Sequence, residues 1–196
     1  MVDSSIGCKT GVNLQSGKNL IGTITQPKAV FIDTKFLKTL PANQIRNGLG
    51  EIIKCGVIAD IKLFNYIEQN LAGIFKLEDK VIDHIIKRSV EIKVGVIEND
   101  EKELGRRMIL NYGHSYGHAL EKLSNYTLLH GYAISIGMVI ANDIAIKKGL
   151  LKKSDAERIK NLLTKAGLPT STIKKVSMKD LANDKKRVGN YINLIL

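Results

Sequence analysis

The sequence has no tryptophan and few aromatic residues of any kind, with Phe and Tyr making up 5% of 196 residues. Proteins that bind single-stranded nucleic acid stack bases on aromatic side chains, so this scarcity argues against that function. No run approaches the roughly 18 apolar residues of a membrane-spanning helix, and the first residues lack the basic-then-apolar pattern of a signal peptide. Two cysteines, Cys8 and Cys55, are too few for a disulfide framework, so we expect a cytoplasmic protein.

Acidic residues are also scarce, because 19 Asp and Glu face 30 Lys and Arg, for a formal charge of +11. The lysines are spread from Lys9 to Lys186 without a dense run, which disfavours nucleic acid as the partner. The positive charge is then explained either by an anionic small-molecule substrate or by a generally lysine-rich composition.

The hydrophobic pattern predicts helices over most of the chain, with short strands near its ends. Residues 1–24, rich in Gly, Ser, Thr and Asn, are expected to form loops. Strands are predicted at 28–33 and 190–196, and helices from about 42 onward, at 77–101, 114–125, 130–149, 155–167 and 177–186. Ser154 is the expected N-cap of the helix at 155–167, and Gly149 and Gly167 are the expected helix ends. The apolar strand at 190–196 has no partner in view, which indicates part of a larger protein.

Three of the four histidines cluster in the sequence. His114 and His118 are four residues apart in NYGHSYGHALE (111–121), and His130 follows twelve residues later. An i, i+4 pair on one helical face can bind a metal, or one histidine can be a ligand while the other is an acid or base. Glu51 and Glu121 are among the acidic residues that can complete such a set. His84, the fourth histidine, is expected on the surface.

Two glycines, Gly113 and Gly117, each stand directly before a histidine. Glycine inside a helix costs roughly 1 kcal/mol relative to alanine. Their presence predicts that a neighbouring helix or a ligand approaches the backbone closely here.

Seven stretches of the chain carry a family resemblance through their order and spacing. They are DSSIGCKTGVN (3–13), GKNLIG (17–22), PKAVFIDTKFLKTLP (27–41), GLGEIIKCGVI (48–58), ENDEKELGRRMILNYGHSYGHALE (98–121), LHGYAISIGM (129–138) and DKK (184–186). Together they resemble the 3-dehydroquinate synthase family, the zinc- and NAD-dependent sugar-phosphate cyclases.

The resemblance implies a mainly α fold, the helical C-terminal domain of that family with a few short strands. This domain would cover residues 41–196 and be truncated at its C-terminus, while residues 1–40 would border an N-terminal α/β NAD-binding domain that this chain lacks. On this interpretation the chain is a fragment that is inactive alone, and the full-length protein is a homodimer.

The same resemblance implies the roles of individual residues. Zinc, or another divalent metal such as Co²⁺, would be held by Glu51, His114 and His130. His118 would lie outside the metal set, as a substrate contact and proton-transfer group, and Lys9 and Lys54 would join it as catalytic residues.

The implied substrate is an anionic seven-carbon keto acid phosphate, 3-deoxy-D-arabino-heptulosonate 7-phosphate, which the family converts to 3-dehydroquinate and phosphate. The matching substrate-binding positions are Lys9, Asn19, Lys54, Lys93, Arg107, Asn111, His118, Lys185 and Lys186. The matching NAD positions are Asp3, Lys18, Phe36, Thr39 and Leu40, and most NAD contacts would lie upstream.

Two residues depart from the family pattern. Cys8 stands where a glycine is usual, and Tyr132 stands where a glutamate usually follows the His-Gly motif. The loss of that glutamate leaves open a sister cyclase of the 2-deoxy-scyllo-inosose or valiolone type. A third hypothesis is a non-catalytic metal-binding or oligomerisation remnant.

Overall fold

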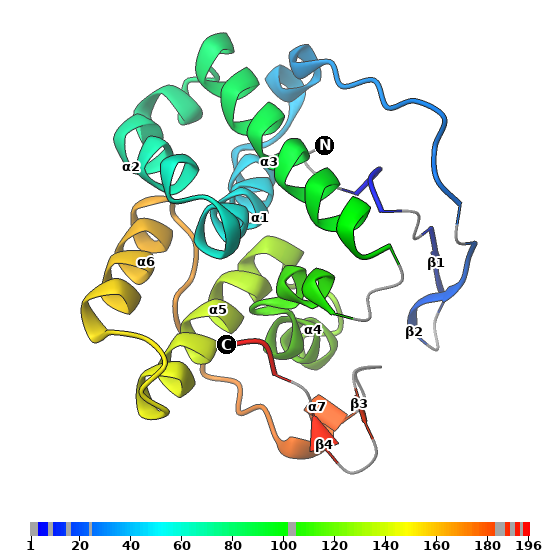
Figure 1. The fold of residues 1–196 in the computed structure, drawn as a ribbon, viewed down its shortest axis with the longest axis vertical. Helices are drawn as coiled ribbons and strands as arrows, with labels where there is room; N and C mark the ends of the chain where they lie inside the picture. Colours follow the sequence, from blue (N-terminus) through cyan, green and yellow to red (C-terminus); the bar gives the residue numbers. More distant parts are fainter. Residues whose placement is uncertain are drawn as a thin grey trace.

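The computed structural model describes residues 4–7, 10–14, 17–23, 25–101, 105–182, 187–188, 191–192 and 194–196. Helices dominate these residues, as the hydrophobic pattern predicts, and the strands are short (Figure 1). The mainly α fold expected from the sequence is therefore confirmed. No helix in the described part of the chain is long and apolar enough to cross a membrane.

The helical core is built around α1 (Ala42–Ala59), which packs against α2 (Ile61–Phe75), α3 (Asp79–Asn99), α5 (His130–Lys147) and α6 (Lys153–Lys165). The 3₁₀ helix η2 (Arg106–Asn111) leads into α4 (His114–Leu123), which lies along α5. The short α7 (Met178–Ala182) follows and contacts α4. Figure 1 shows α1 between the α2–α3 pair and the α4–α5 pair.

Hydrophobic spacing accounts for the burial of these helices. In α3, Val81, Ile82, Ile85 and Ile86 are buried along one face, as their i, i+3, i+4 spacing predicts. Helix α5 instead buries apolar side chains around most of its circumference, which is typical of a helix enclosed by others. His84 is exposed on α3, as expected, with its ring centroid 4.1 Å from that of Tyr66.

The amino-terminal segment differs from the sequence prediction in two places. Within the expected loop, β1 (Val12–Leu14) and β2 (Gly17–Ile21) form an antiparallel hairpin, in which Val12 is opposite Ile21. The predicted strand at 28–33 is wrong, because these residues are neither helix nor strand and lead into the 3₁₀ helix η1 (Thr34–Thr39). An apolar run forms a strand only where a neighbouring strand takes up its backbone hydrogen bonds.

Two further predictions near the carboxyl end are wrong in detail. Helix α6 begins at Lys153, one residue before Ser154, and no described side chain caps it. Of the expected strand at 190–196, Tyr191–Ile192 form β4, which pairs with β3 (Arg187–Val188), so the partner is supplied locally, whereas residues 194–196 are neither helix nor strand. Gly149 and Gly167 follow helices α5 and α6 with φ of +70°, as their C-terminal role requires.

Candidate metal centre

Close backbone contacts at glycines bring helices α1, α4 and α5 together. A Cβ on Gly131 of α5 would lie 1.9 Å from the Asn47 carbonyl oxygen of α1, and one on Gly50 would lie 2.8 Å from the Gly131 carbonyl oxygen. On the other side of α5, a Cβ on Gly137 would lie 2.0 Å from the carbonyl oxygen of Gly113. The close approach predicted at Gly113 is therefore made by a neighbouring helix, α5.

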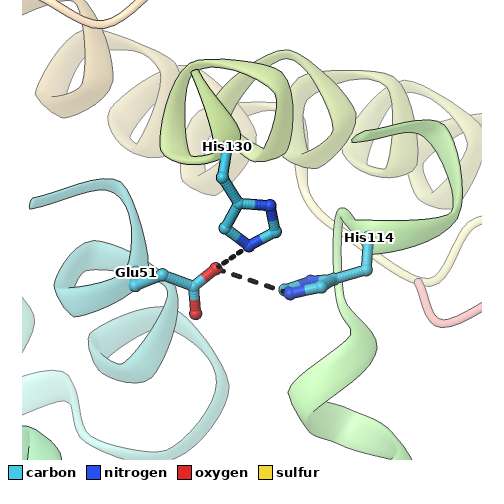
Figure 2. A group of neighbouring side chains, drawn as sticks. All are labelled: Glu51, His114 and His130. Carbon is cyan, nitrogen blue, oxygen red and sulfur yellow. Dashed lines mark ion pairs between the residues drawn. The ribbon is translucent and has the colours of Figure 1, made fainter. Parts of the chain in front are cut away.

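Each of these glycine contacts is next in the sequence to a residue of the expected metal set. Gly50 precedes Glu51, Gly113 precedes His114, and Gly131 follows His130. Figure 2 shows the three side chains pointing toward one another from their separate helices. Nε2 of His114 and Nε2 of His130 each lie 3.4 Å from Oε1 of Glu51.

These separations fit three ligands of one tetrahedral ion. With metal–ligand bonds of about 2.0–2.1 Å, neighbouring ligand atoms of a tetrahedral zinc lie about 3.3 Å apart. Oε1 of Glu51 is buried and has no hydrogen-bond partner among the described residues. A buried carboxylate oxygen without a partner is costly unless a cation satisfies it, so the donor set fits a divalent metal ion.

Other groups orient the three side chains. Nζ of Lys54, on the next turn of α1, donates to Oε2 of Glu51 at 2.5 Å and to the Leu110 carbonyl oxygen at 3.0 Å. Nδ1 of His114 lies 3.1 Å from the Tyr112 carbonyl oxygen, and Nδ1 of His130 lies 3.3 Å from Oε2 of Glu121. Both imidazoles therefore have Nδ1 beside an oxygen acceptor and direct Nε2 toward Glu51.

The electrostatics of the centre favour an ionised carboxylate and a positive charge beside it. Burial opposes ionisation of Glu51, but the ammonium of Lys54 and then the imidazoles of His114 and His130 hold its pKa well below the usual range. Burial and the nearby Lys54 charge lower the pKa of His114 well below its usual value, despite Glu51. Burial also acts to lower the pKa of His130, but Glu121 and Glu51 raise it to about 9.

His118 lies beside the metal set. Its ring centroid is 5.3 Å from that of His114 and 6.0 Å from that of His130. A second group of potential ligands, His118, Glu121 and His130, also has its atoms close enough to hold one ion. The structure therefore brings together the three histidines singled out in the sequence, and it shows two ways in which they can combine with a carboxylate.

Three further residues of the expected substrate site lie on η2 and α3. Arg107 of η2 is buried, and its guanidinium donates to the carbonyl oxygens of Gly7 at 2.9 Å and Glu101 at 2.6 Å. Lys93 of α3 lies near the same glycine, with Cε 3.7 Å from where a Cβ of Gly7 would be. Asn111 ends η2, two residues before Gly113, the N-cap residue of α4. The guanidinium of Arg107 is thus held by backbone carbonyl oxygens and lies beside the loop at 4–7.

The expected NAD residues lie apart along the first segment. Phe36 and Thr39 belong to η1, which packs against α3, and Leu40 ends it; the Phe36 side chain is 69% exposed. Lys18 and Asn19 lie on β2. Asp3, Lys9, Lys185 and Lys186 lie outside the described residues, as does Cys8.

The sequence did not reveal several residues that build the centre. Among these, Asn47 accepts the backbone N–H of Gly131 through Oδ1 at 2.6 Å, and the carbonyl groups of Leu110 and Tyr112 hold Lys54 and His114. The glycines beside Glu51 and His130 carried a signal, because each adjoins its expected ligand in the sequence, as Gly113 adjoins His114. Tyr132, which departs from the family pattern, is partly buried and packs against the hydrophobic core.

Comparison with protein families and known proteins gives a consistent result. Residues 48–187 match the family model of the 3-dehydroquinate synthase C-terminal domain, and residues 1–47 match that of the N-terminal domain. The chain is 50% identical over 203 residues to the 3-dehydroquinate synthase of Prochlorococcus marinus (strain MIT 9312), covering 100% of this chain and 56% of that protein. It is 48% identical over 200 residues to the 3-dehydroquinate synthase of Sulfurovum sp. (strain NBC37-1), covering 100% and 56%. The chain thus spans about half the length of the curated relatives it matches.

Similar solved structures are more distant in sequence. A 2-epi-5-epi-valiolone synthase from Streptomyces hygroscopicus subsp. jinggangensis 5008, solved with NAD⁺ and Zn²⁺ bound, superposes with a TM-score of 0.82 at 31% identity, covering 92% of this chain and 50% of that one. A 2-deoxy-scyllo-inosose synthase complexed with carbaglucose-6-phosphate, NAD⁺ and Co²⁺ gives a TM-score of 0.82 at 32% identity, covering 100% and 54%.

Proposed function

Because the chain belongs to the 3-dehydroquinate synthase family, we propose that the protein of which it is part converts 3-deoxy-D-arabino-heptulosonate 7-phosphate to 3-dehydroquinate and phosphate. The observation that carries this proposal is the convergence of His114 and His130 on Oε1 of Glu51, a buried oxygen that accepts no hydrogen bond from the described residues. Identities of 48% and 50% to 3-dehydroquinate synthases, against 31% and 32% to two sister cyclases, support this substrate over those of the sister enzymes.

Glu51, His114 and His130 would hold the metal, Zn²⁺ or Co²⁺. One carboxylate and two imidazoles leave a coordination position for a substrate oxygen, and the 39% exposure of the His130 side chain leaves this side of the set accessible. When bound, the ion would polarise the substrate hydroxyl that is oxidised. The chain's own contribution is to fix the ligand orientation through Lys54, Tyr112 and the helix contacts.

His118 would contact the substrate and transfer a proton near the departing phosphate. Its position beside His114 and His130, without a place in the Glu51 set, supports this division of labour. Lys54 and Lys9 would act with it as catalytic cations. Asn19, Lys93, Arg107, Asn111, Lys185 and Lys186 would complete the substrate site, because carboxylate and phosphate groups need cations and hydrogen-bond donors.

The proposed cofactor, NAD, and the proposed cellular role of the full protein rest on its family membership. Asp3, Lys18, Phe36, Thr39 and Leu40 would contribute the chain's share of the NAD site, and the dinucleotide carries the redox step. Residues 1–40 would border the NAD-binding domain, and residues 41–196 would form the metal- and substrate-binding domain. The full protein would be a cytoplasmic homodimeric lyase of the shikimate pathway and aromatic amino acid biosynthesis.

The experiment that tests this function measures phosphate release by the full-length protein with NAD⁺ and Zn²⁺. We expect turnover of the seven-carbon keto acid phosphate and none of glucose 6-phosphate. Turnover of glucose 6-phosphate alone would identify a sister cyclase. Glu51→Ala should abolish both metal binding and phosphate release, and full metal retention in that variant would show that the ligand set is wrong.

A further inference from the structure

His130 lies between two carboxylates, and each of its ring nitrogens is beside one of them. Nε2 is 3.4 Å from Oε1 of Glu51, whereas Nδ1 is 3.3 Å from Oε2 of Glu121. We propose that Glu121 is a positioning residue, which holds the proton of His130 on Nδ1 and thereby reserves Nε2 for the metal. The inference rests on the metal centre proposed above and adds a residue to it.

Glu121 is buried in the packed region between the helices. It is 2% exposed on α4, the helix that carries His114 and His118. Its backbone carbonyl accepts hydrogen bonds from Oγ of Ser124 and from the N–H of Tyr126, both at 2.7 Å, at the end of that helix. A buried carboxylate costs folding free energy unless its partners satisfy it. The contact with Nδ1 of His130 is one of the interactions that can satisfy this carboxylate.

The choice between the two possible ligand groups depends on this contact. His130 belongs both to the set with Glu51 and His114 and to the set with His118 and Glu121. A neutral imidazole has one N–H and one lone pair. When Nδ1–H donates to Glu121, the lone pair is on Nε2, which faces Glu51. The contact therefore selects the Glu51 set and leaves His118 available for the substrate.

The same orientation is achieved differently in the other imidazole ligand. Nδ1 of His114 faces the backbone carbonyl of Tyr112 at 3.1 Å, an acceptor that no side-chain substitution removes. For His130 the corresponding acceptor is a side chain. Acceptors of this kind fix the tautomer and ring orientation of a metal-bound histidine, and their loss typically costs about 10–100-fold in metal affinity.

Glu121→Gln and Glu121→Leu test the role in metal-free protein titrated with Co²⁺ against a competing chelator. We expect affinity to fall by about 10–100-fold in Glu121→Leu and by less in Glu121→Gln, whose amide oxygen still accepts from Nδ1–H. Asp60→Asn is the matched control, since it removes another buried carboxylate, one that pairs with Arg88, and it should leave Co²⁺ affinity unchanged. The thermal midpoint of each metal-free variant shows whether the fold is intact.

A second readout reports the tautomer directly. In ¹⁵N spectra of the zinc-loaded protein, His130 should carry its proton on Nδ1, and Glu121→Leu should weaken or shift that signal while the signals of His114 stay in place. Unchanged affinity and an unchanged His130 signal in Glu121→Leu would overturn the proposal. Equal losses of affinity in His118→Gln and Glu121→Gln, with Glu51→Gln unaffected, would instead make Glu121 a ligand of the second set.

Failure of the proposed metal centre is distinguishable from failure of this inference. If Glu51→Gln loses Co²⁺ binding and both Glu121 variants retain it, the centre stands and the positioning role is wrong. If the unsubstituted protein binds no Co²⁺, the centre and the positioning role are both wrong.

Discussion

Gly131 at the start of α5 lies directly against Asn47 of α1. Oδ1 of Asn47 accepts the backbone N–H of Gly131 at 2.6 Å, and a Cβ on Gly131 would lie 1.9 Å from the Asn47 carbonyl oxygen. Because Glu51 is one turn from Asn47 and His130 is next to Gly131, this contact sets how closely two of the proposed ligands approach.

Gly131→Ala should force α1 and α5 apart. Overpacking of this kind costs about 1–3 kcal/mol in the free energy of unfolding, and Co²⁺ affinity should fall with it. Gly95→Ala is the matched control, because Gly95 lies inside α3 and no other described part of the chain comes within 4 Å of where its Cβ would be. That control should stabilise the protein by up to about 1 kcal/mol. Urea denaturation of both variants measures the difference, and equal stabilities would contradict the close-contact account.

His114→Ala and His118→Ala should separate the roles of two histidines on one helix. A metal that binds only the folded state raises stability by about 2.7 kcal/mol when present at 100 times its dissociation constant. We expect Zn²⁺ to raise the thermal midpoint of the unsubstituted protein and of His118→Ala, and a chelator to reverse the increase. His114→Ala should show almost no zinc-dependent increase. A larger loss in His118→Ala than in His114→Ala would favour the second ligand group.

The sequence predicted the helices better than it predicted the short strands. Repeated apolar spacing, as in Val81 to Ile86 of α3, predicts a helix because the buried face of a helix is formed by residues close together in the sequence. Strands depend on a partner, so the apolar run at 28–33 was mistaken for one, and the partner of β4 was not foreseen at Arg187–Val188.

Within the site, the sequence indicated which side chains could take part, but it did not indicate which backbone groups do. His114 and His130 stood out because the chain has only four histidines. Glu51 was one of several acidic candidates and was singled out by the family resemblance; the structure shows that it is buried. The carbonyl groups of Leu110 and Tyr112 accept from Lys54 and contact His114, respectively. Every residue has such a carbonyl group, so the residue types do not show which of them face the site.

Lys54→Met should destabilise the metal-free protein strongly. Nζ of Lys54, itself 3% exposed, bonds Oε2 of Glu51 at 2.5 Å. Removing one partner of a buried ion pair typically costs about 3–5 kcal/mol, because the other charge stays buried without compensation. Lys62→Met, at an exposed lysine of α2, should change stability by less than about 0.5 kcal/mol.

A double-mutant cycle distinguishes the ion pair from lost packing. Combining Lys54→Met with Glu51→Gln should restore part of the free energy of unfolding, since the second change removes the uncompensated charge. Additive losses in the double variant, measured by urea denaturation with a chelator present, would show that the two side chains are not coupled.

Asp60→Asn should give a stability difference that depends on pH. Oδ1 of Asp60 accepts the N–H of Lys62 at the start of α2, and Oδ2 accepts from Nε of Arg88. Burial acts to raise the pKa of Asp60, but the bond to Arg88 and the backbone N–H groups of Leu63 and Lys62 hold it below its usual value. Asparagine is also a good N-cap, so the variant removes the charge while retaining the cap.

The sign of this dependence follows from the lowered pKa. A carboxyl group with a lower pKa in the folded state contributes stability above its unfolded pKa of about 3.9 and loses it as pH falls through the folded value. Asp60→Asn should therefore be less stable than the unsubstituted protein at pH 7, and the difference should shrink as pH falls below about 4. Thermal midpoints of both proteins between pH 3 and pH 7 measure this, each taken with a chelator so that metal binding does not contribute. A difference that stayed constant across this range would show that the ionised Asp60–Arg88 pair does not stabilise the junction of α1 and α2.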